Sequence, residues 1–214
     1  RDVERSRGLG DVYKRQGLDG ASVCIQTGTT TELNLAEYFK GNNIKYNPVP
    51  IETNAEAQEL YKAGRCDVYT TDASGLYATM MSFDNPSDHM VLPEIVSKEP
   101  LGPVVRHGDD QWADIVSWVL RAMMAAEEKG ITSKNVKELA AKDNKDKEIN
   151  RLLGKDPLQG LSKLGLSPDW AVNVISQVGN YQESFEKHLF PLTIKRGMNA
   201  LYRDGGLHYI PPIK

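Results

Sequence analysis

Residues 21–95 alternate between short apolar runs and stretches of helical periodicity, and this alternation constrains the fold more than any other feature of the sequence. Four runs are predicted to be strands: 21–27, 45–51, 66–71 and 90–95. Helices are predicted between them, the first capped by Thr30 or Thr31 and the second by Thr53, whose spacing to Glu56 is that of a capping box. Such alternation is typical of a parallel sheet with right-handed crossovers, so the sequence predicts an α/β fold.

Two prolines indicate the order of these strands. Pro48 and Pro50 lie in the second strand, which is predicted at an edge of the sheet because proline cannot donate to a sheet ladder. Strand 21–27 is then internal and neighbours strand 66–71. Ligands of parallel sheets bind beyond the carboxyl ends of the strands. The candidate binding residues at two such ends are Gly28, Thr29 and Thr30 after the first strand and Asp72 after the third.

The second half of the chain is richer in helices. The apolar pair Val104–Val105 predicts a strand over 103–107, and an amphipathic helix follows at about 111–129, capped by Asp109 or Asp110. The later predictions are a short helix capped by Ser133, a piece at 148–153, a helix opened by Ser167 and Pro168, helices near 182–189 and 193–203, and core positions for Trp112 and Trp170. A lone strand cannot form a sheet, so 103–107 either joins the first sheet or has partners outside this chain.

Composition and charge argue against several classes of function. The chain has 214 residues, of which 40% are hydrophobic and 26% charged, as in ordinary globular proteins. The net charge of −3 offers no basic face for a nucleic acid, and no run approaches the roughly 18 apolar residues of a membrane span. Residues 1–16 are charged and lack the apolar region of a signal peptide, so they are predicted to be a disordered tail or sequence foreign to the domain.

Several segments, in a fixed order, resemble the periplasmic general L-amino-acid-binding proteins of polar amino-acid ABC transporters, which are solute-binding proteins of family 3. The segments are DGASVCIQTGTTTELNL, AGRCDVYTTDASGLYA, VLPEIVSKEPLGPVVRHGDDQW, DWAVNVISQVGNYQESFEKHL and RGMNALYRDGGLHYIPPIK. The resemblance runs from about residue 18 to residue 214. GTT alone is a weak motif, whereas the whole ordered set is specific.

The resemblance implies a periplasmic-binding-protein type II-like α/β fold, in which two lobes joined by a hinge close on the ligand. Residues 18–96 correspond to a complete lobe 2 with a parallel-rich sheet, 97–102 to the hinge crossover, and 103–214 to the C-terminal, helix-rich part of lobe 1. The chain is therefore expected to be an N-terminally truncated fragment. Residues 1–17 are expected to lie outside the family, and a signal peptide is expected upstream.

The resemblance also implies separate roles for two residues. In the family, the threonine matching Thr30 binds the α-carboxylate of the ligand, and the acid matching Asp72 binds its α-ammonium group; both positions could instead serve only as helix caps. The further candidate contacts are Gly28, Thr29, Thr31 and Thr71. The family's main carboxylate anchor, an arginine of lobe 1, has no match here, so weak or undetectable amino-acid binding is expected of this chain.

The two cysteines, Cys24 and Cys66, fall in the predicted neighbouring strands. In an oxidising periplasm they are expected to form a disulfide within lobe 2, which needs Cα atoms within about 7 Å; the alternative is two buried thiols. A nucleophilic cysteine is not expected, because no histidine is placed to activate either thiol. The four histidines show no metal-ligand spacing, so no metal and no cofactor are expected.

The function implied by the resemblance is periplasmic capture of free L-amino acids of many kinds and their delivery to the permease subunits of an ABC importer in the inner membrane. The protein is expected to act as a monomer by hinge closure, with no nucleic-acid partner and no chemistry on the ligand. Two alternatives use the same fold. A ligand-sensing module of a receptor would normally be followed by a membrane span, and a dehydratase-like enzyme would need an acid or base beyond Asp72.

Overall fold

The computed structural model describes residues 18–97, 101–156 and 161–212. The chain forms two compact units, Arg1–Pro100 and Leu101–Lys214. The predicted tail at 1–17, and residues 98–100 of the predicted hinge crossover, lie outside the described residues.

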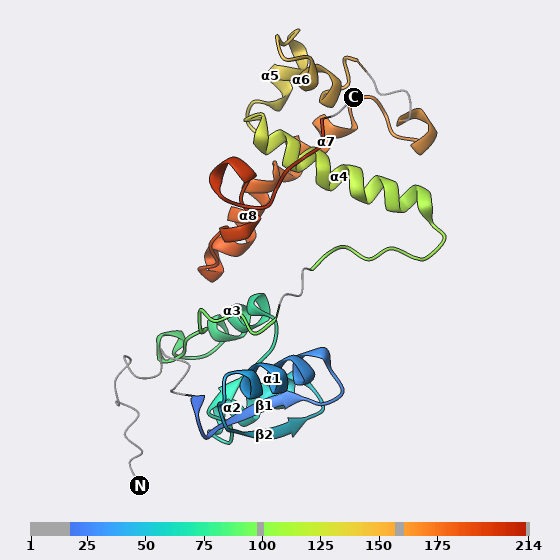
Figure 1. Ribbon diagram of the computed structural model, residues 1–214. Coiled ribbons are helices and arrows are strands. Elements are labelled where there is room, and N and C mark those ends of the chain that lie inside the picture. Colours follow the sequence, from blue (N-terminus) through green and yellow to red (C-terminus); the bar gives the residue numbers. More distant parts are fainter. Residues whose placement is uncertain (1–17, 98–100, 157–160, 213–214) are drawn as a thin grey trace. The chain divides into compact units, whose positions relative to one another are not determined.

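A three-stranded parallel sheet in the order β2–β1–β3 forms the centre of the first unit (Figure 1). The strands are β1 (Ala21–Gln26), β2 (Tyr46–Ile51) and β3 (Val68–Tyr69). β1 pairs with β2 along its six residues, but with β3 only at Val23 with Val68 and at Cys24 with Tyr69. The predicted order is confirmed, since the proline-bearing strand lies at an edge and β1 in the middle.

A helix follows each strand of this sheet. The helices are α1 (Thr30–Gly41), α2 (Asn54–Lys62) and α3 (Ala73–Met81), and a 3-10 turn, η2 (Pro86–Asp88), comes after α3. Val23 and Ile25 of β1 belong to the same buried cluster as Phe39 of α1, whereas Cys24 clusters with Ala57 of α2. Because successive side chains of a strand point to opposite faces, α1 and α2 cover opposite faces of the sheet.

Two predicted strands are not formed in the described residues. Residues 90–95 include Pro93, which has no N–H for a ladder, and Ile95, which is 78% exposed. Residues 103–107 also run without strand pairing, and the Val104 side chain is 95% exposed. An apolar run becomes a strand only when a partner strand accepts its backbone hydrogen bonds, and neither run has one in the described ranges.

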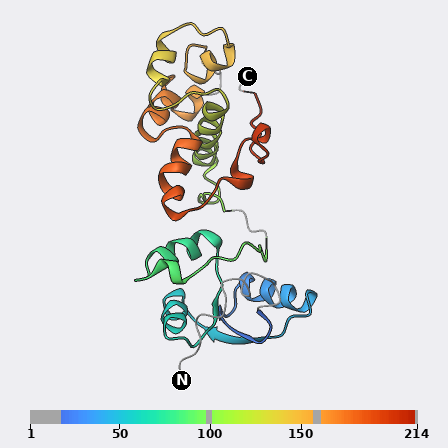
Figure 2. The same cartoon turned by 90° about the vertical axis from the view of Figure 1, so that its left-hand side faces the viewer.

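The second unit is built from helices. The α-helices are α4 (Asp110–Glu128), α5 (Val136–Ala141), α6 (Lys147–Leu152), α7 (Trp170–Val178) and α8 (Tyr181–Leu189), and the 3-10 turns are η3 (Leu161–Leu164), η4 (Phe190–Leu192), η5 (Gly197–Asn199) and η6 (Tyr202–Asp204). α4 lies against α7 and α8 (Figures 1 and 2). Together with the parallel sheet of the first unit, these helices confirm the predicted fold class.

The core of the second unit forms where α4 meets α7. Ala122 and Ala126 of α4 are buried with Trp170 and Ile175 of α7, and the small alanine side chains let the two helices approach closely. The predicted core position of Trp170 is confirmed. The prediction for Trp112 is wrong, since its side chain is 52% exposed in the first turn of α4, more than two turns before the alanine face.

Several helix boundaries follow from caps and left-handed residues. Asp109 caps α4 by accepting a 3.1 Å hydrogen bond from the backbone N–H of Trp112, as predicted. α7 begins later than predicted, at Trp170 with Asp169 in the N-cap position. The predicted helix over 193–203 is wrong. Thr193 has a φ of 61° and Gly197 a φ of 49°, and these left-handed residues break the segment into short 3-10 turns.

α8 begins with a capping box that also holds the loop after α4. The side chain of Asn180 accepts the backbone N–H of Glu183, and the Glu183 carboxylate accepts that of Asn180, both at 2.9 Å. The same carboxylate accepts the hydroxyl of Ser133 at 2.7 Å, so Ser133 does not cap α5 as predicted; Asn135 holds that position. Burial opposes ionisation of Glu183, but these hydrogen bonds outweigh it and lower the pKa of the carboxyl.

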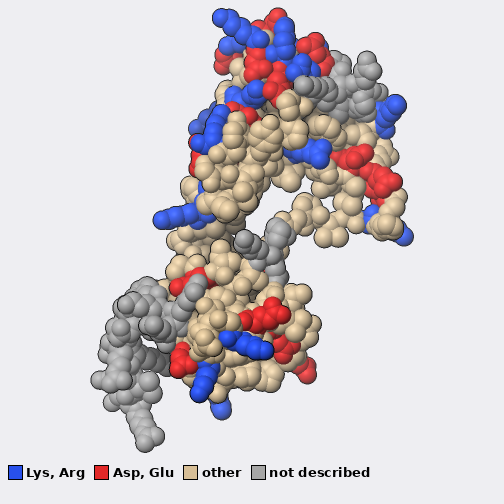
Figure 3. Space-filling view, in the orientation of Figure 1, with Lys and Arg blue, Asp and Glu red and all other residues tan. Residues whose placement is uncertain are grey.

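Charged side chains of both signs are intermingled over α5 and α6 (Figure 3). Lys129 contacts Asp146 at 3.0 Å and Glu148 at 2.6 Å, and two i,i+4 pairs lie nearby. The two i,i+4 pairs are exposed and contribute little to stability, whereas the Lys129 pairs are partly buried.

A buried ion pair ties the C-terminal segment to α4. Arg196 donates to both carboxylate oxygens of Glu127, at 2.8 and 3.0 Å, and its guanidinium group lies over the Tyr181 ring. The His208 ring meets Tyr181 edge-on at 4.6 Å, and its Nδ1 atom is buried without a hydrogen-bond partner in the described part of the chain. Burial, helped by the Arg196 charge and opposed by Glu127, lowers the pKa of His208.

We expect the second unit to lose stability below about pH 6.5 through His208. Because the folded pKa is lowered, the unfolded chain takes up the proton first as the pH falls below the ordinary value of about 6.5, and stability drops until the folded pKa is passed. The three tryptophans all lie in this unit, so tryptophan fluorescence during urea unfolding between about pH 8 and pH 5 measures the loss. Over this pH range the His208→Leu variant should lose less stability than the wild type. The His188→Gln variant, which replaces an exposed histidine, should lose as much as the wild type. A loss in His208→Leu equal to that of the wild type would contradict the role of His208.

Candidate functional site

The carboxyl ends of β1 and β3 lie at the same end of the sheet, because the two strands are parallel neighbours. The loop after β1 leads into α1, and the loop after β3 leads into α3. Thr30 is the first residue of α1, and Asp72 directly precedes α3; both are exposed. The structure therefore brings these two candidates to one end of the sheet, where ligands of parallel sheets bind.

The three threonines at the start of α1 have different roles. Thr29, and not Thr30 or Thr31, is the N-cap: its hydroxyl accepts the backbone N–H of Glu32 at 3.3 Å and donates to the carbonyl of Gln26 at 2.7 Å. Both hydrogen bonds of the Thr29 hydroxyl therefore serve the start of the helix. Thr30 and Thr31 occupy the first two helical positions, where backbone N–H groups point out of the helix and favour anions.

Glu32 also takes part in the candidate site, although the sequence prediction did not include it. Its Oε2 atom accepts the backbone N–H of Gly28 at 2.8 Å, so this N–H is held inside the loop. Gly28 has a φ of 72°, a left-handed conformation that favours glycine. A signal for Glu32 was present, because Thr29 and Glu32 have the same capping-box spacing as Thr53 and Glu56.

Asp72 presents its carboxylate at the start of α3. The residue occupies the N-cap position, and its carbonyl accepts the N–H of Leu76 at 2.9 Å, but its side chain makes no capping hydrogen bond. The alternative role as a side-chain cap is therefore not what the structure contains. A carboxylate is favourably placed at a helix N-terminus, where it can also attract a cation.

Thr71 contributes to the loop itself. Burial raises the pKa of the Tyr69 hydroxyl, and hydrogen bonds with the side chains of Thr71 and Gln58 oppose the shift. The Tyr69 hydroxyl also donates to Asn54 at 3.2 Å. Thr71 itself lies two residues after β3, in the loop that leads to Asp72.

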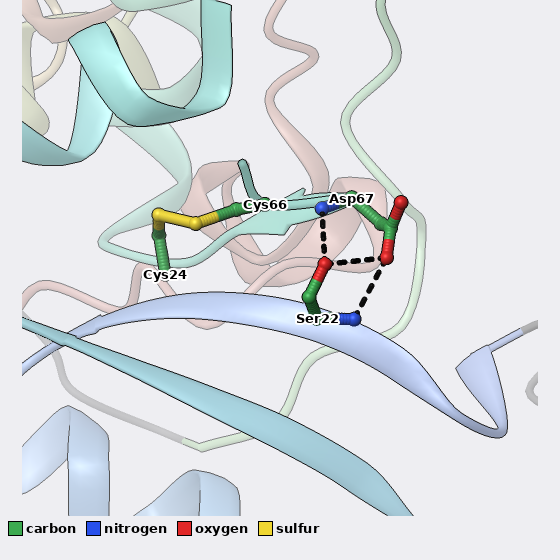
Figure 4. The surroundings of a disulfide bond; sticks show 4 residues. All are labelled: Ser22, Cys24, Cys66 and Asp67. Atoms are coloured by element: carbon green, nitrogen blue, oxygen red, sulfur yellow. Dashed lines mark hydrogen bonds between the residues drawn. A yellow bond between two sulfur atoms is a disulfide. The ribbon is translucent and has the colours of Figure 1, made fainter. Parts of the chain in front are cut away.

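A disulfide joins β1 to the segment just before β3, and these two segments lead to Thr30 and Asp72 (Figure 4). Cys24 and Cys66 are both buried and their Cα atoms lie 5.6 Å apart, so the expected bond is confirmed and the alternative of two thiols is not. Beside it, the backbone N–H and hydroxyl of Ser22 donate to Asp67 Oδ2 at 2.8 and 2.5 Å, and the Asp67 N–H donates to the Ser22 hydroxyl at 3.0 Å. No sequence pattern pointed to the Ser22–Asp67 pair.

The end of the sheet offers groups of opposite character. Asp72 supplies a negative acceptor, while the hydroxyl of Thr30 and the N-terminus of α1 supply donors. A free amino acid carries the complementary pair, an ammonium group and a carboxylate. Among the described residues, no cluster of three or more His, Cys, Asp or Glu side chains is arranged to hold a metal ion.

The hollow described for this chain contains none of the candidate residues. A shallow hollow of about 240 Å³ on the second unit is lined by Phe190, Thr193, Ile194 and Lys195, none of which is a candidate. None of the helices in the described ranges is both long and apolar enough to cross a membrane.

Comparison with known proteins finds relatives along almost the whole chain. The general L-amino acid-binding periplasmic protein AapJ of Rhizobium johnstonii is 55% identical over 201 residues, which are 92% of this chain and 58% of that protein. The glutamate/glutamine/aspartate/asparagine-binding protein BztA of Rhodobacter capsulatus is 50% identical over 215 residues, 99% of this chain and 62% of the relative. The putative amino-acid ABC transporter-binding protein YhdW of Escherichia coli K12 is 52% identical over 200 residues, with coverages of 92% and 58%.

The chain is also similar to a solved structure of a periplasmic binding protein. An ABC transporter periplasmic binding protein from Brucella ovis, with glutathione bound, superposes with a TM-score of 0.88 at 49% identity, covering 96% of this chain and 65% of that one. No protein-family model matches the chain. The chain spans about three fifths of the length of the curated relatives that it matches.

Proposed function

The chain is a homologue of the periplasmic amino-acid-binding proteins of ABC transporters, and from this premise we propose that it binds free L-amino acids and delivers them to an ABC importer. The observation that carries the proposal is the placement of Thr30 and Asp72 at one end of the sheet, with an exposed Asp72 carboxylate that is not used as a cap. The names of AapJ and BztA support L-amino acids as the ligand class, including glutamate, glutamine, aspartate and asparagine.

The proposed contacts engage only atoms that all amino acids share. The α-carboxylate accepts from the Thr30 hydroxyl and from the N-terminus of α1, where the helix dipole favours an anion. The α-ammonium donates to Asp72, in a charge-assisted hydrogen bond of the stronger kind. Since neither contact reads the side chain, the arrangement favours broad specificity. Of the other residue candidates, Gly28 and Thr29 are hydrogen-bonded within the loop before α1 and support the site, while Thr31, at the second position of α1, and Thr71, in the loop before α3, stay candidate contacts.

The proposal also covers the protein's cellular location, oligomeric state and partners. A periplasmic location fits the relatives and the disulfide, because disulfides persist in oxidising compartments. We propose that the protein works as a monomer, that its partners are the permease subunits in the inner membrane, and that the ligand leaves chemically unchanged. The relatives are named as binding proteins, which supports a role without catalysis.

A γ-glutamyl peptide is a second candidate ligand, favoured by the Brucella ovis protein with glutathione bound. The γ-glutamyl residue of glutathione keeps a free α-ammonium and a free α-carboxylate. The proposed contacts with Thr30 and Asp72 therefore fit it as well as they fit glutamate.

Titration calorimetry with the complete product of the gene tests the proposal. L-Glutamate and L-glutamine should bind with a Kd of micromolar order or tighter, whereas glutarate, which lacks the ammonium group, should bind at least about a hundredfold more weakly. Binding of glutathione alone would select the second candidate. Binding of none of these ligands, by a protein that unfolds cooperatively, would overturn the proposed function.

A further inference from the structure

β3, the strand that leads to Asp72, pairs with the rest of its sheet over a short length. Within the described range 18–97, β3 consists of Val68–Tyr69 and pairs with β1 at two positions, while β2 pairs with β1 at six. The loop after β1 is further bonded to the end of β2, through the N–H of Thr27 to the carbonyl of Ile51 at 3.1 Å. Thr30 thus belongs to a well-paired part of the sheet, and Asp72 to a sparsely paired part.

Two cross-links join β1 to Cys66 and Asp67, the two residues that precede β3. One is the Cys24–Cys66 disulfide, buried on the face covered by α2. The other is the set of bonds between Ser22 and Asp67, which includes a 2.9 Å bond from the Asp67 N–H to the Ser22 carbonyl. Figure 4 shows both links between the same two segments. We call Ser22, Cys24, Cys66 and Asp67 together the clamp.

The clamp lies at equal chain distances from the two proposed ligand contacts. Cys24 comes six residues before Thr30, and Cys66 six residues before Asp72. Between the clamp and each contact run a strand and a short loop, with no flexible linker. Any change in the spacing of β1 and β3 at the clamp therefore passes to the spacing of Thr30 and Asp72.

We propose that the clamp is a positioning device, whose residues set the separation of the carboxylate-binding and ammonium-binding groups without touching the ligand. This inference rests on the proposed function. A ligand held at two points gains affinity from both contacts only if they are already correctly spaced, because the cost of ordering a mobile contact is subtracted from the binding free energy. A displacement of about 1 Å at one contact can cost up to about a hundredfold in function.

The test measures affinity for L-glutamate and thermal stability in the same set of variants of the complete gene product. The variants that break the clamp are Cys24→Ala with Cys66→Ala, and Asp67→Ala. Asp67→Asn is the conservative rescue, because its amide oxygen can still accept from Ser22. Phe39→Leu is the control, since it loosens the core of α1 near the helix end opposite Thr30 and leaves the clamp intact.

The clamp account predicts a specific pattern of affinities. At a temperature where they are folded, both clamp-breaking variants should bind L-glutamate at least about tenfold more weakly than the wild type. The affinity of Asp67→Asn should lie within about threefold of the wild-type value. The affinity of Phe39→Leu should lie within about twofold of it, although its Tm is lower. If the double cysteine variant does not fold, the affinity of Asp67→Ala tests the proposal by itself. Wild-type affinity in folded clamp variants, or equal losses in Phe39→Leu, would overturn the clamp while leaving the proposed function intact. A wild-type protein that binds no amino acid would overturn both.

Discussion

Replacing both cysteines, with Cys24→Ala and Cys66→Ala, should lower the free energy of unfolding of the first unit by about 4 kcal/mol. The disulfide closes a loop with a sequence separation of 42, and loops of this size restrict the unfolded chain by an amount between the roughly 3 and 4.7 kcal/mol of shorter and longer loops. Domains are stable by about 5–15 kcal/mol, so this loss is a large share of the total. Both sulfur atoms are buried in the cluster that joins β1 to α2, so the loss falls on the centre of the unit.

Two spectroscopic signals separate this effect from general destabilisation. The first unit contains the three-stranded sheet and no tryptophan, so its unfolding is followed by the ¹H–¹⁵N NMR signals of β1, and that of the second unit by tryptophan fluorescence. The cysteine variant should shift the sheet transition by much more than the tryptophan transition. A sheet transition that shifts by less than about 1 kcal/mol would contradict the stabilising role of the disulfide.

Asp72→Asn should weaken the binding of L-glutamate by at least about thirtyfold, which corresponds to the lower end of the roughly 2–5 kcal/mol lost when one member of a buried charge pair is removed. Asparagine has nearly the same shape, but it is neutral and turns N–H donors toward the ligand's ammonium group. Stability should be almost unchanged, because the Asp72 side chain makes no capping hydrogen bond that the substitution would remove.

Asp84→Asn is the matched control for this experiment, since it makes the same charge change at another exposed position of the first unit. It should bind L-glutamate as wild type does. Weak binding of glutarate should be insensitive to Asp72→Asn, because glutarate has no ammonium group to lose. Undiminished binding of L-glutamate by Asp72→Asn, or an equal loss in Asp84→Asn, would contradict the assignment of the ammonium contact.

The features that could be predicted from the sequence are those with a local physical cause. Pro48 and Pro50 cannot donate to a ladder, and this placed β2 at an edge. That order put Cys24 and Cys66 on neighbouring segments, where the disulfide is found. Caps were predictable where a side chain meets its own helix, as with Thr53 and Asp109.

The features that could not be predicted depend on partners far away in the chain. Ser133 has the character of a cap, but Glu183, 50 residues on, takes its hydroxyl. Asp67 bonds with Ser22 across 45 residues, and nothing in either neighbourhood indicates the pair. The apolar run at 103–107 resembles a strand, yet strand formation depends on a partner and not on the run itself.

The candidate site was predictable in position but not in detail. Thr30 and Asp72 follow from the strand ends, because a parallel sheet collects its carboxyl ends on one side. Their separate roles come only from the family resemblance and stay predictions. The capping-box spacing of Thr29 and Glu32 indicates that the two residues belong to one helix start, but not that the Glu32 carboxylate accepts from Gly28, because several backbone N–H groups of that loop lie within its reach.

The central claim is that an amino acid binds at the end of the sheet that carries Thr30 and Asp72. Two-dimensional ¹H–¹⁵N NMR of the complete, labelled gene product during titration with L-glutamate tests it most directly, because each backbone N–H reports on its own surroundings. We expect saturable shifts that, within the first unit, are largest at Thr30, Thr31 and Asp72, and that glutarate, which lacks the ammonium group, does not reproduce at the same concentrations. Saturable binding that leaves these three signals unmoved while others shift would contradict it.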